Sequence, residues 1–511
     1  MFSDVPSKKR LTTQERANFK NVFASVLNVD LMDHQVDGII WMSNMENSSL
    51  HGGGLADDMG LGKTLQTIMC SVANGINDTL IVCPNALTSG WMSEFDKLNI
   101  NIKRTLYHGS SRDKVVLSDY SVVITTYGTL VAESKLENST FLKRQWNRVV
   151  LDESQVIKNH ETKVAKACFA LKSTYRWCLS GTPVQNNIQE LFASLHFLQV
   201  PEYSDYDTFI SRVVCGSDAQ TISDIIFLRR EKMTTLKNRL LKKKIIDYEC
   251  PFGDVEAKAY NDMQNKMRVK QFLSKRRQQQ QQEQEEAEGA QRPAVGQRQN
   301  QDTSTLARLS ALRMGCNDVR FVTDCELPNE TASSKQRAVT DLAISFVNRG
   351  KKVLIFSQYL DMICRLKKHI IEQVPDMPIW SLTGSQNTPR KRDPIISGFQ
   401  KHQGGAILIL QTMVGSVGLN LTQATRVILV EPWWNPFVDD QAMDRAHRIG
   451  QEQQVVVYRC FVPKTIEERI LILQDNKRDM VKDMWGNPIS TQACTSKLTK
   501  KEVRYLLGRA F

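Results

Sequence analysis

A short run of small and charged residues near the N-terminus has the composition of a phosphate-binding loop. It ends in Gly62-Lys63-Thr64, where backbone N–H groups and the lysine ammonium can hold a polyphosphate and the threonine hydroxyl can bind Mg²⁺. Asp57 stands where the usual loop pattern has its first glycine. A chance Gly-Lys-Thr in a surface turn is the alternative. The residues predicted to bind a nucleotide here are Asp57, Asp58, Met59, Gly60, Leu61, Gly62, Lys63 and Thr64.

An acidic pair supplies the second half of a nucleotide-hydrolysing site. The apolar run at residues 149–151 is typical of a buried parallel strand, and Asp152 and Glu153 follow it directly. Asp152 would hold Mg²⁺, and Glu153 would orient and deprotonate the attacking water. A solvated turn is the alternative for an isolated Asp-Glu pair. The preceding strand and the upstream loop favour a site for a nucleotide and Mg²⁺, in which Lys63, Asp152 and Glu153 are catalytic.

Composition limits the class of protein. The chain has 511 residues, a formal charge of +12 and 41% hydrophobic residues, which suffices for cores in roughly two to four domains. It contains no apolar stretch of about 18 residues, and its N-terminus is polar, so we expect neither a membrane span nor a signal peptide. The 11 cysteines include no Cys-x-x-Cys pair, which predicts reduced thiols and no zinc module. The basic charge favours a polyanionic partner such as nucleic acid, with a mildly basic enzyme as the alternative.

Two stretches of the chain alternate short apolar runs with helix-forming segments, which is typical of parallel α/β sheets. Between them, a glutamine run at residues 278–282 and its polar surroundings cannot form a core, so we expect a solvated linker. A helix is predicted from Glu256 into this run because Glu, Gln, Lys and Arg are good helix formers. The predicted buried strands are residues 80–83, 122–124, 149–151, 177–179, 353–356, 406–410, 427–430 and 455–458.

Further segments, in a fixed order, resemble the SWI/SNF-type ATPases of helicase superfamily two. The strongest are Ser-Gly-Thr-Pro at residues 180–183 and Asp-Glu-Ser-Gln at residues 152–155, where many family members have histidine in place of Gln155. Leu31-x-x-His34-Gln35 is similar to the adenine-reading segment that precedes the phosphate loop in the family. The other matching segments are residues 83–84 with 91–95, 125–127, 312–317, 415–422 and 441–451.

The resemblance implies an α/β fold of two RecA-like parallel-sheet lobes in tandem, with an ATP cleft between them. It also implies that Gln35 reads the adenine edge and that Gly418 and Gln441 of the second lobe contribute to ATP binding. A buried structural role or a helix-terminal contact is the alternative for Gln35. The expected boundaries are an N-terminal extension at residues 1–24, a first lobe at 25–250, a helical, glutamine-rich linker at 251–305, a second lobe at 306–480 and a C-terminal tail at 481–511.

Two arginines of the second lobe are expected to complete the catalytic site. Residues 439–449 contain good helix formers, and Gly450 is placed as a C-terminal stop. On such a helix Arg445 and Arg448 share one face, which suits two guanidinium groups that converge on a phosphate. A solvated helix with an i,i+4 pair between Asp444 and Arg448 is the alternative.

The resemblance further implies that double-stranded DNA runs across both lobes and is bound independently of sequence, with a strong salt dependence. Ser180 and Thr182 would couple the phosphate site to the DNA, while a Ser/Thr turn before a proline helix start also accounts for them. Trp433 and Trp434 would stack on a base or pack at the lobe interface. The expected DNA-binding and coupling residues are Pro84, Thr125, Thr126, Ser180, Thr182, Ser385 and Thr412, with Gly384 beside them.

These implications predict a DNA-stimulated ATP hydrolase that translocates on double-stranded DNA and remodels protein–DNA complexes, in transcription regulation or DNA repair in the nucleus. Nucleosomes and transcription proteins are candidate partners. A strand-separating helicase and a non-hydrolysing regulator that binds DNA or transcription factors are the alternatives. The segment at residues 432–436 resembles the branch of the helicase-like transcription factor, and the compact chain resembles the global transactivators of insect DNA viruses. The linker lacks the Cys/His spacing of a RING insertion, so no ubiquitin-ligase activity is expected.

Overall fold

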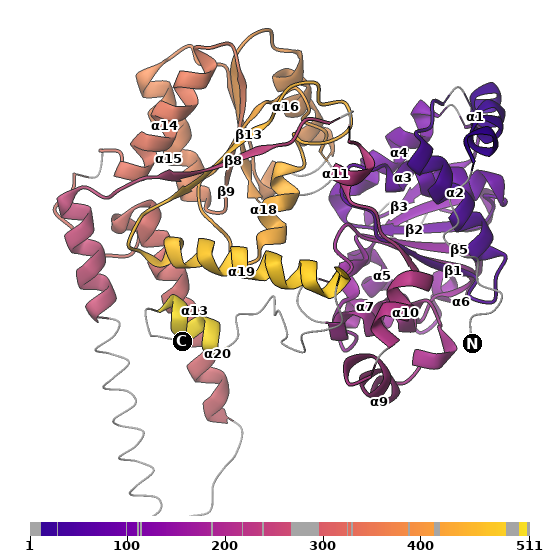
Figure 1. The fold of residues 1–511 in the computed structure, drawn as a ribbon. Coiled ribbons are helices and arrows are strands. Elements are labelled where there is room, and N and C mark those ends of the chain that lie inside the picture. Colours follow the sequence, from indigo (N-terminus) through magenta and orange to yellow (C-terminus); the bar gives the residue numbers. More distant parts are fainter. Residues whose placement is uncertain are drawn as a thin grey trace, which may run out of the picture.

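The computed structural model contains two parallel sheets with helices on both faces, which form two lobes side by side (Figure 1). This architecture confirms the predicted fold class of two RecA-like lobes in tandem. The residues that the structure describes are 12–27, 29–98, 100–109, 112, 115–184, 188–216, 218–237, 240–266, 296–323, 325–328, 331–386, 389–412, 419–486 and 500–507.

All strand pairs in both sheets are parallel, so each successive strand is reached by a crossover connection. The first sheet has the order β3 (Arg104–Tyr107), β4 (Val122–Thr126), β2 (Thr79–Cys83), β5 (Gln145–Asp152), β6 (Lys172–Leu179), β1 (Gly52–Leu55), β7 (Phe227–Leu228). The second has the order β10 (Ile379–Leu382), β11 (Ala406–Gln411), β9 (Lys352–Ser357), β12 (Arg426–Leu429), β13 (Val456–Phe461), β8 (Lys244–Glu249).

Each predicted strand coincides with or overlaps an observed one, and five observed strands, β1, β3, β7, β8 and β10, were not predicted. β1 begins with three glycines, which is a composition typical of a turn. The strand is nevertheless buried between β6 and β7. A Cβ added to Gly54 would lie 2.1 Å from the Phe227 ring, so the neighbouring strand leaves no room for a side chain. The glycines of β1 therefore serve close packing.

The boundary predicted at residue 250 is wrong for β8. This strand pairs with β13 over six residues, from Lys244 opposite Val456 to Glu249 opposite Phe461, so it belongs to the second sheet. It forms the edge of that sheet, and its residues alternate between exposed and half-buried positions, which leaves no continuous apolar run in the sequence. The chain thus enters the second lobe before the helical linker, as Figure 1 shows.

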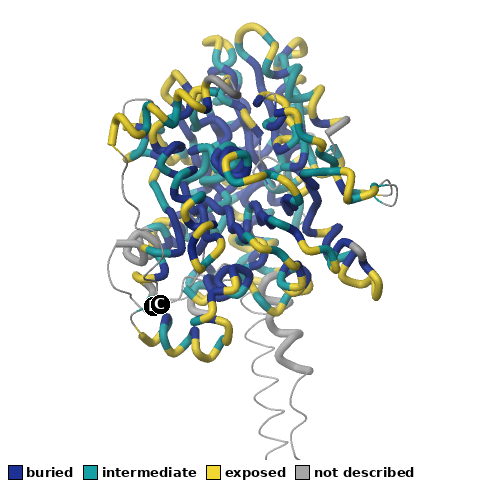
Figure 2. The backbone as a smooth tube through the Cα atoms, turned by 90° about the vertical axis from the view of Figure 1, so that its right-hand side faces the viewer, coloured by how far each residue is buried: buried dark blue, intermediate teal, exposed yellow. Residues whose placement is uncertain are grey.

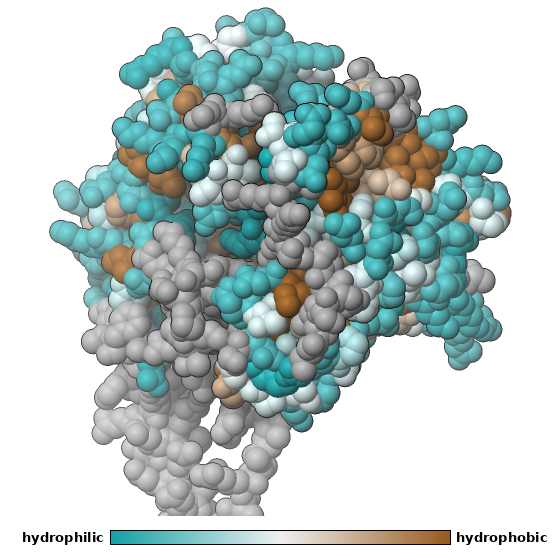
Figure 3. All heavy atoms as spheres, turned by 45° about the vertical axis from the view of Figure 1, so that its right-hand side comes forward, coloured by the Kyte–Doolittle hydropathy of each residue, from teal (hydrophilic) through white to brown (hydrophobic). Residues whose placement is uncertain are grey.

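Helices cover both faces of each sheet and bury separate apolar cores, which appear dark blue in Figure 2. On the face drawn in Figure 3, hydrophilic side chains predominate and hydrophobic residues form separate patches. No helix of the described chain is long and apolar enough to cross a membrane. The first-lobe helices are α1 (Thr13–Leu27), α2 (Asp33–Glu46), α3 (Lys63–Ala73), α4 (Thr88–Lys97), α5 (Tyr127–Glu133), α6 (Thr140–Lys143), α7 (Lys163–Phe169), α8 (Leu191–Phe197), α9 (Tyr206–Phe209), α10 (Asp218–Ile225) and α11 (Lys232–Thr235). The later helices are α13 (Gly296–Asn317), α14 (Ser334–Val347), α15 (Leu360–Gln373), α16 (Pro389–Lys401), α18 (Pro436–Met443), α19 (Ile466–Gly486) and α20 (Lys500–Leu506).

The segments outside the two sheets are attached to the lobes. α1 crosses the predicted boundary at residue 24, and Arg16 forms an ion pair with Asp37 of α2 at 2.9 Å. Residues 254–266 are helical, as predicted from Glu256 onward, whereas the glutamine run lies outside the described residues. In the C-terminal tail, Leu506 of α20 is buried in a cluster with residues of α13 and α19.

The parallel topology brings the candidate functional residues to one edge of each sheet. In the first sheet, β1, β2, β4, β5 and β6 all end at the same edge, because parallel strands share a direction. The loops that follow these strands carry most of the first-lobe residues predicted to bind nucleotide and DNA. Ligands of open parallel sheets bind at this carboxyl edge.

A buried ion pair ties α2 to the first sheet. Arg148 of β5 donates two hydrogen bonds to the carboxylate of Glu46, at 2.5 and 2.7 Å, and both side chains are fully buried. Trp177 Nε1 and Asn74 Nδ2 donate to the same carboxylate at 2.9 and 2.8 Å. Each charge thus has a partner, which is the condition for tolerating charges in a core.

We expect Arg148→Met to lower the free energy of unfolding of the first lobe by about 3–5 kcal/mol, because Glu46 would remain buried without its cation. Urea unfolding followed by tryptophan fluorescence measures this loss. The double variant Glu46→Leu/Arg148→Met should recover part of it. Arg144→Met breaks a pair with the more exposed Asp78 and should cost less than about 1 kcal/mol. Equal losses in Arg148→Met and Arg144→Met would contradict the expectation.

Candidate nucleotide-binding site

The phosphate loop connects β1 to α3 at the carboxyl edge of the first sheet. Gly60 and Gly62 have φ values of +88° and +84°, a left-handed conformation that other residues disfavour. α3 begins at Lys63, so its unpaired N–H groups and the positive end of its dipole lie at the loop. The Lys63 ammonium lies across the loop and donates to the carbonyl of Asp57 at 2.6 Å. The loop therefore has the form of an anion-binding site.

Asp57, the departure from the loop pattern, has a structural partner. Its carboxylate is fully buried and accepts hydrogen bonds from Arg230 and from Gln66 Nε2, the latter at 3.2 Å. Arg230 also donates to the carbonyl of His34 and to Gln66 Oε1, the latter at 2.7 Å. Because a buried carboxylate is stable only when paired, these contacts hold the start of the loop in place. Lys63 contacts the backbone carbonyl of Asp57 and not its carboxylate.

The acidic pair lies at the end of β5 and is close to the phosphate loop. Asp152 Oδ2 accepts a hydrogen bond from Trp91 Nε1 at 2.8 Å, and Oδ1 accepts one from the Glu153 N–H at 2.9 Å. Burial, followed by the charge of Glu153, raises the pKa of Asp152 to about 7, although Lys63 opposes this effect. A carboxylate that is costly to ionise on its own is suited to bind a cation.

A chain of hydrogen bonds connects the acidic pair to the end of β6. Gln155 Nε2 donates to Glu153 Oε2 at 2.6 Å, and Ser180 Oγ donates to Gln155 Oε1 at 2.7 Å. The Thr182 N–H in turn donates to Ser180 Oγ at 3.0 Å. Glutamine can replace histidine in this chain because its amide both donates and accepts. The bond from the Thr182 N–H to Ser180 Oγ forms a serine turn. This turn is compatible with the predicted role of Ser180 in coupling the phosphate site to DNA.

The helix predicted over residues 439–449 is wrong beyond Met443, where α18 ends and turns follow. The carbonyls that a longer helix would use have partners from other segments. The Arg445 carbonyl accepts a hydrogen bond from the Leu421 N–H at 3.0 Å, and the next carbonyl accepts one from Gln451 Nε2 at 3.1 Å. The helix itself ends where the Arg445 N–H donates to the carbonyl three residues back, at 3.2 Å, and Arg445 Nε takes the Gln441 carbonyl that the next helical bond would use.

The turn after α18 carries both arginines to the phosphate loop of the other lobe. Arg445 Nη2 lies 3.8 Å from Met59 Sδ, and Arg445 is only 4% exposed. A Cβ added to Gly60 would lie 3.0 Å from Arg448 Cβ. Burial, followed by the charge of Arg448, lowers the pKa of Arg445 to about 10. The half-buried Arg448 guanidinium donates to the Leu419 carbonyl of its own lobe at 3.4 Å. The two cations together favour a polyanion at the loop.

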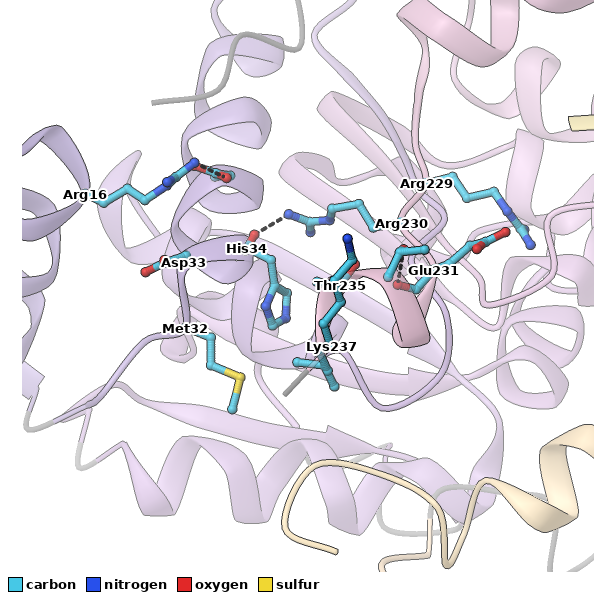
Figure 4. A pocket seen from close by; sticks show the side chains of 12 residues that line it. Arg16, Met32, Asp33, His34, Arg229, Arg230, Glu231, Thr235 and Lys237 are labelled. Atoms are coloured by element: carbon cyan, nitrogen blue, oxygen red, sulfur yellow. Dashed lines mark hydrogen bonds and ion pairs between the residues drawn. The ribbon is translucent and has the colours of Figure 1, made fainter. Parts of the chain in front are cut away.

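Gln35 lies at the start of α2 and makes a helix-terminal contact. Its Oε1 accepts from the Met32 N–H at 3.0 Å, and its Nε2 donates to the Leu61 carbonyl at 3.5 Å. The neighbouring residue His34 lines a cavity of about 660 Å³ between α2 and α11, which Figure 4 shows with His34 and Arg230 in contact. This volume suffices for a nucleoside, and Arg230 connects the cavity to the phosphate loop.

The oxygen donors at the site fit a magnesium ion that arrives with a nucleotide. Among the described residues, no group of three or more His, Cys, Asp and Glu side chains could hold a metal ion. Mg²⁺ at nucleotide sites, however, commonly takes one or two protein ligands and completes its shell with phosphates and water. Thr64 at the start of α3 and Asp152 at the end of β5 are donors of this kind.

Most residues predicted to contact DNA lie at the carboxyl edges of the sheets. Pro84 follows β2, Ser385 lies in the turn after β10, and Thr412 follows β11. In the second lobe, the Gly384 N–H donates to Gln411 Oε1 at 2.9 Å, which ties these two loops together.

The prediction that Thr125 offers its hydroxyl to a DNA phosphate is wrong. Thr125 is fully buried, and its hydroxyl donates to the Tyr107 carbonyl at 2.8 Å. The hydroxyl of Thr126 accepts from the Thr129 N–H at 3.2 Å and thereby caps α5. Thr125 therefore holds β4 to the edge strand β3.

Trp433 and Trp434 stack on each other with ring centroids 3.9 Å apart, and both are half-buried. The Arg313 guanidinium lies 4.4 and 4.8 Å from the two ring centroids, so the rings form a cation–π cluster within the second lobe.

The sequence did not point to Arg230 or Lys232, although a basic cluster directly after a buried strand was a usable signal. Of the second-lobe residues predicted to bind ATP, Gln441 accepts a hydrogen bond from Arg445 Nε through its carbonyl at 3.1 Å. Gly418 lies outside the described residues.

The chain has two parallel-sheet lobes, and the first carries a phosphate loop and an acidic strand end. Arginines of the second lobe face this site. Together these features define a helicase-like ATPase core. Two family models match the chain, the SNF2-related domain over residues 34–320 and the helicase conserved C-terminal domain over residues 334–450. The chain belongs to the SNF2-related family.

Relatives of different lengths resemble this chain. An ATP-dependent helicase of Schizosaccharomyces pombe is 26% identical over 94% of the chain and 62% of its own length. The TATA-binding protein-associated factor mot1 of the same organism is 31% identical over 89% of the chain but 26% of its own length. A global transactivator of Orgyia pseudotsugata multicapsid polyhedrosis virus is 32% identical over 88% of the chain and 91% of its own length. The SWI2/SNF2 ATPase core of Sulfolobus solfataricus, solved in complex with double-stranded DNA, is 28% identical over 95% of the chain and 98% of that core, with a TM-score of 0.42.

We expect Arg230→Met to weaken nucleotide binding by about tenfold, or ~1.4 kcal/mol, because the unpaired Asp57 carboxylate would distort the phosphate loop. Titration with a fluorescent ADP analogue measures this change. The double variant Asp57→Asn/Arg230→Met should bind more tightly than Arg230→Met because no buried charge is left unpaired. Arg337→Met, on the outer helix α14, should match the wild type. A double variant as weak as Arg230→Met would show that Arg230 acts on the nucleotide directly.

Proposed function

We propose that this protein hydrolyses ATP in response to double-stranded DNA and uses the energy to translocate along the duplex. The observation that carries the proposal is the contact between lobes at the phosphate loop, where Arg445 lies beside Met59 and Arg448 beside Gly60. A nucleotide bound on Lys63 would contact both lobes. Its hydrolysis would remove that connection and allow the lobes to separate.

Each charged group at the site receives a role in this proposal. Lys63 and Thr64 hold the phosphates and Mg²⁺, together with Asp152, and Glu153 orients the attacking water. Arg445 and Arg448 neutralise the charge that develops on the γ-phosphate. Groups of this kind can contribute on the order of 10³–10⁵ in rate. The adenine and ribose occupy the cavity beside Gln35.

Double-stranded DNA is the proposed track. The Sulfolobus core was solved in complex with double-stranded DNA, and in this chain the loops after β2, β10 and β11 offer backbone and hydroxyl groups at the carboxyl edge of each sheet. Such groups bind phosphates without reading base sequence. We further propose that the protein remodels protein–DNA complexes in the nucleus, with nucleosomes or transcription proteins as targets, because its relatives include a TATA-binding protein-associated factor and a DNA excision repair protein ERCC-6-like of Danio rerio.

Phosphate release from ATP should rise when linear double-stranded DNA is added. Arg445→Ala should lower kcat by about 10³–10⁵, because it removes transition-state charge stabilisation. Lys63→Ala and Glu153→Gln should also abolish DNA-stimulated release, whereas Lys368→Met on the outer helix α15 should not. Wild-type activity that DNA fails to stimulate, and that Lys63→Ala leaves unchanged, would support the non-hydrolysing regulator.

Translocation without strand separation should displace the third strand of a DNA triplex and leave a forked duplex paired. Both reactions can be followed by gel electrophoresis with the same DNA arms and ATP concentration. The displacement rate should fall steeply between 50 and 200 mM salt, because binding depends on phosphate contacts. Opening of the fork at a rate comparable with triplex displacement would favour the strand-separating helicase.

A further inference from the structure

Lys232, the first residue of α11, bridges the two lobes at the phosphate loop. Its backbone N–H donates to Asp58 Oδ2 at 2.9 Å, within the loop of the first lobe. Its ammonium forms an ion pair with Asp444 Oδ2 at 2.9 Å and donates to the His447 carbonyl at 3.0 Å, both in the second lobe. Lys232 is 4% exposed, so these contacts are made in a buried environment. Figure 1 shows α11 between the lobes.

The two groups that Lys232 contacts in the second lobe directly precede the two arginines. Asp444 is followed by Arg445, and His447 by Arg448. Because α18 ends at Met443, no helix holds this turn, and its shape depends on tertiary contacts. The ammonium of Lys232 therefore binds the turn at the two points from which the guanidinium side chains extend.

Other charged groups around Asp444 support the same geometry. Lys243 lies 3.5 Å from Asp444 Oδ1, and His447 Nδ1 lies 4.0 Å from the same oxygen. His447 Nε2 contacts the Leu241 carbonyl at 2.8 Å. Burial opposes ionisation of Asp444, but the ammonium groups of Lys243 and Lys232 outweigh it and lower the pKa of Asp444. The carboxylate is thus charged and paired at neutral pH.

We propose that Lys232 is a positioning residue that aligns Arg445 and Arg448 with the phosphate loop through Asp444 and the His447 carbonyl. This inference rests on the proposed ATP hydrolysis. The N–H and ammonium of Lys232 are engaged by protein groups, so we assign Lys232 no direct contact with the phosphates. It determines where the arginines lie when the lobes are in contact, so its effect falls on the transition state and not on the bound ground state.

The test compares binding of Mg²⁺–ADP with binding of Mg²⁺–ADP–aluminium fluoride, a mimic of the transferring phosphate, in the full chain without DNA. In Lys232→Met we expect the aluminium fluoride complex to bind at least tenfold more weakly, ADP to bind within twofold of the wild type, and kcat to fall at least tenfold. Lys232→Arg, which keeps a cation, should restore part of the kcat. Equal weakening of both ligands, or no change in either, overturns the proposal.

A matched variant separates positioning from simple clamping of the lobes. Arg392 of α16 also joins the lobes, since it donates to the Ala86 carbonyl at 3.0 Å and to Ser89 Oγ. Arg392→Met should change the ratio of the two affinities less than Lys232→Met does. If the two variants behave alike, Lys232 only holds the lobes together and the proposal fails.

Asp444→Asn tests the same pair from the second lobe and decides the question if Lys232→Met does not fold. It should weaken the aluminium fluoride complex selectively. The double variant Lys232→Met/Asp444→Asn should bind the aluminium fluoride complex no more weakly than the more affected single variant does, because both changes break the same interaction. Additive losses would contradict the pairing. If the wild-type protein hydrolyses no ATP, the proposed function fails. If the wild type is active and Lys232→Met is equally active, only the proposal for Lys232 fails.

Discussion

The Arg445 guanidinium of one lobe is buried against the phosphate loop of the other, and the remaining features of the site follow from this contact. Arg445 has a sulfur and a carbonyl as its described partners. Its charge is destabilised by burial and by Arg448, so the pKa of Arg445 is lowered. A triphosphate between the lobes would relieve this cost, whereas a neutral ligand would not. This contact therefore has a preference for a polyanion.

Polar contacts and one small apolar cluster, in which Ile449 packs near Leu61, join the lobes, whereas large apolar cores hold each lobe together. Lys232 with Asp444, and Arg392 with the Ala86 carbonyl, join groups that water can also satisfy. The sheets, in contrast, are held by buried aliphatic and aromatic cores on both faces. Interfaces of the first kind open at modest cost, and cores of the second kind do not. The interface between the lobes should therefore separate more easily than either core.

Two departures, one from the general phosphate-loop pattern and one from the acidic segment of many family members, are compensated by partners elsewhere in the chain. Asp57 replaces a glycine of the phosphate loop, and Arg230 neutralises the carboxylate that this exchange buries. Gln155 replaces a histidine, and its amide still connects Glu153 to Ser180. In both cases the chemistry of the site is kept by a hydrogen-bonding group of suitable reach. Such pairs explain how the loop and the acidic segment retain their geometry.

The sequence by itself determined the two covered parallel sheets, because short apolar runs between helical segments can be buried on both faces only in that arrangement. It also determined the phosphate loop and the acidic pair, whose chemistry resides in contiguous residues. Only the tertiary structure decided where α18 ends, why glycines form β1, and which cation pairs with Asp57. Arg230 is 173 residues away from Asp57, and the turn that follows α18 is held by bonds from Leu421 and Gln451. Contacts between distant segments leave no local pattern, so the placement of the arginines could be known only once the chain had folded.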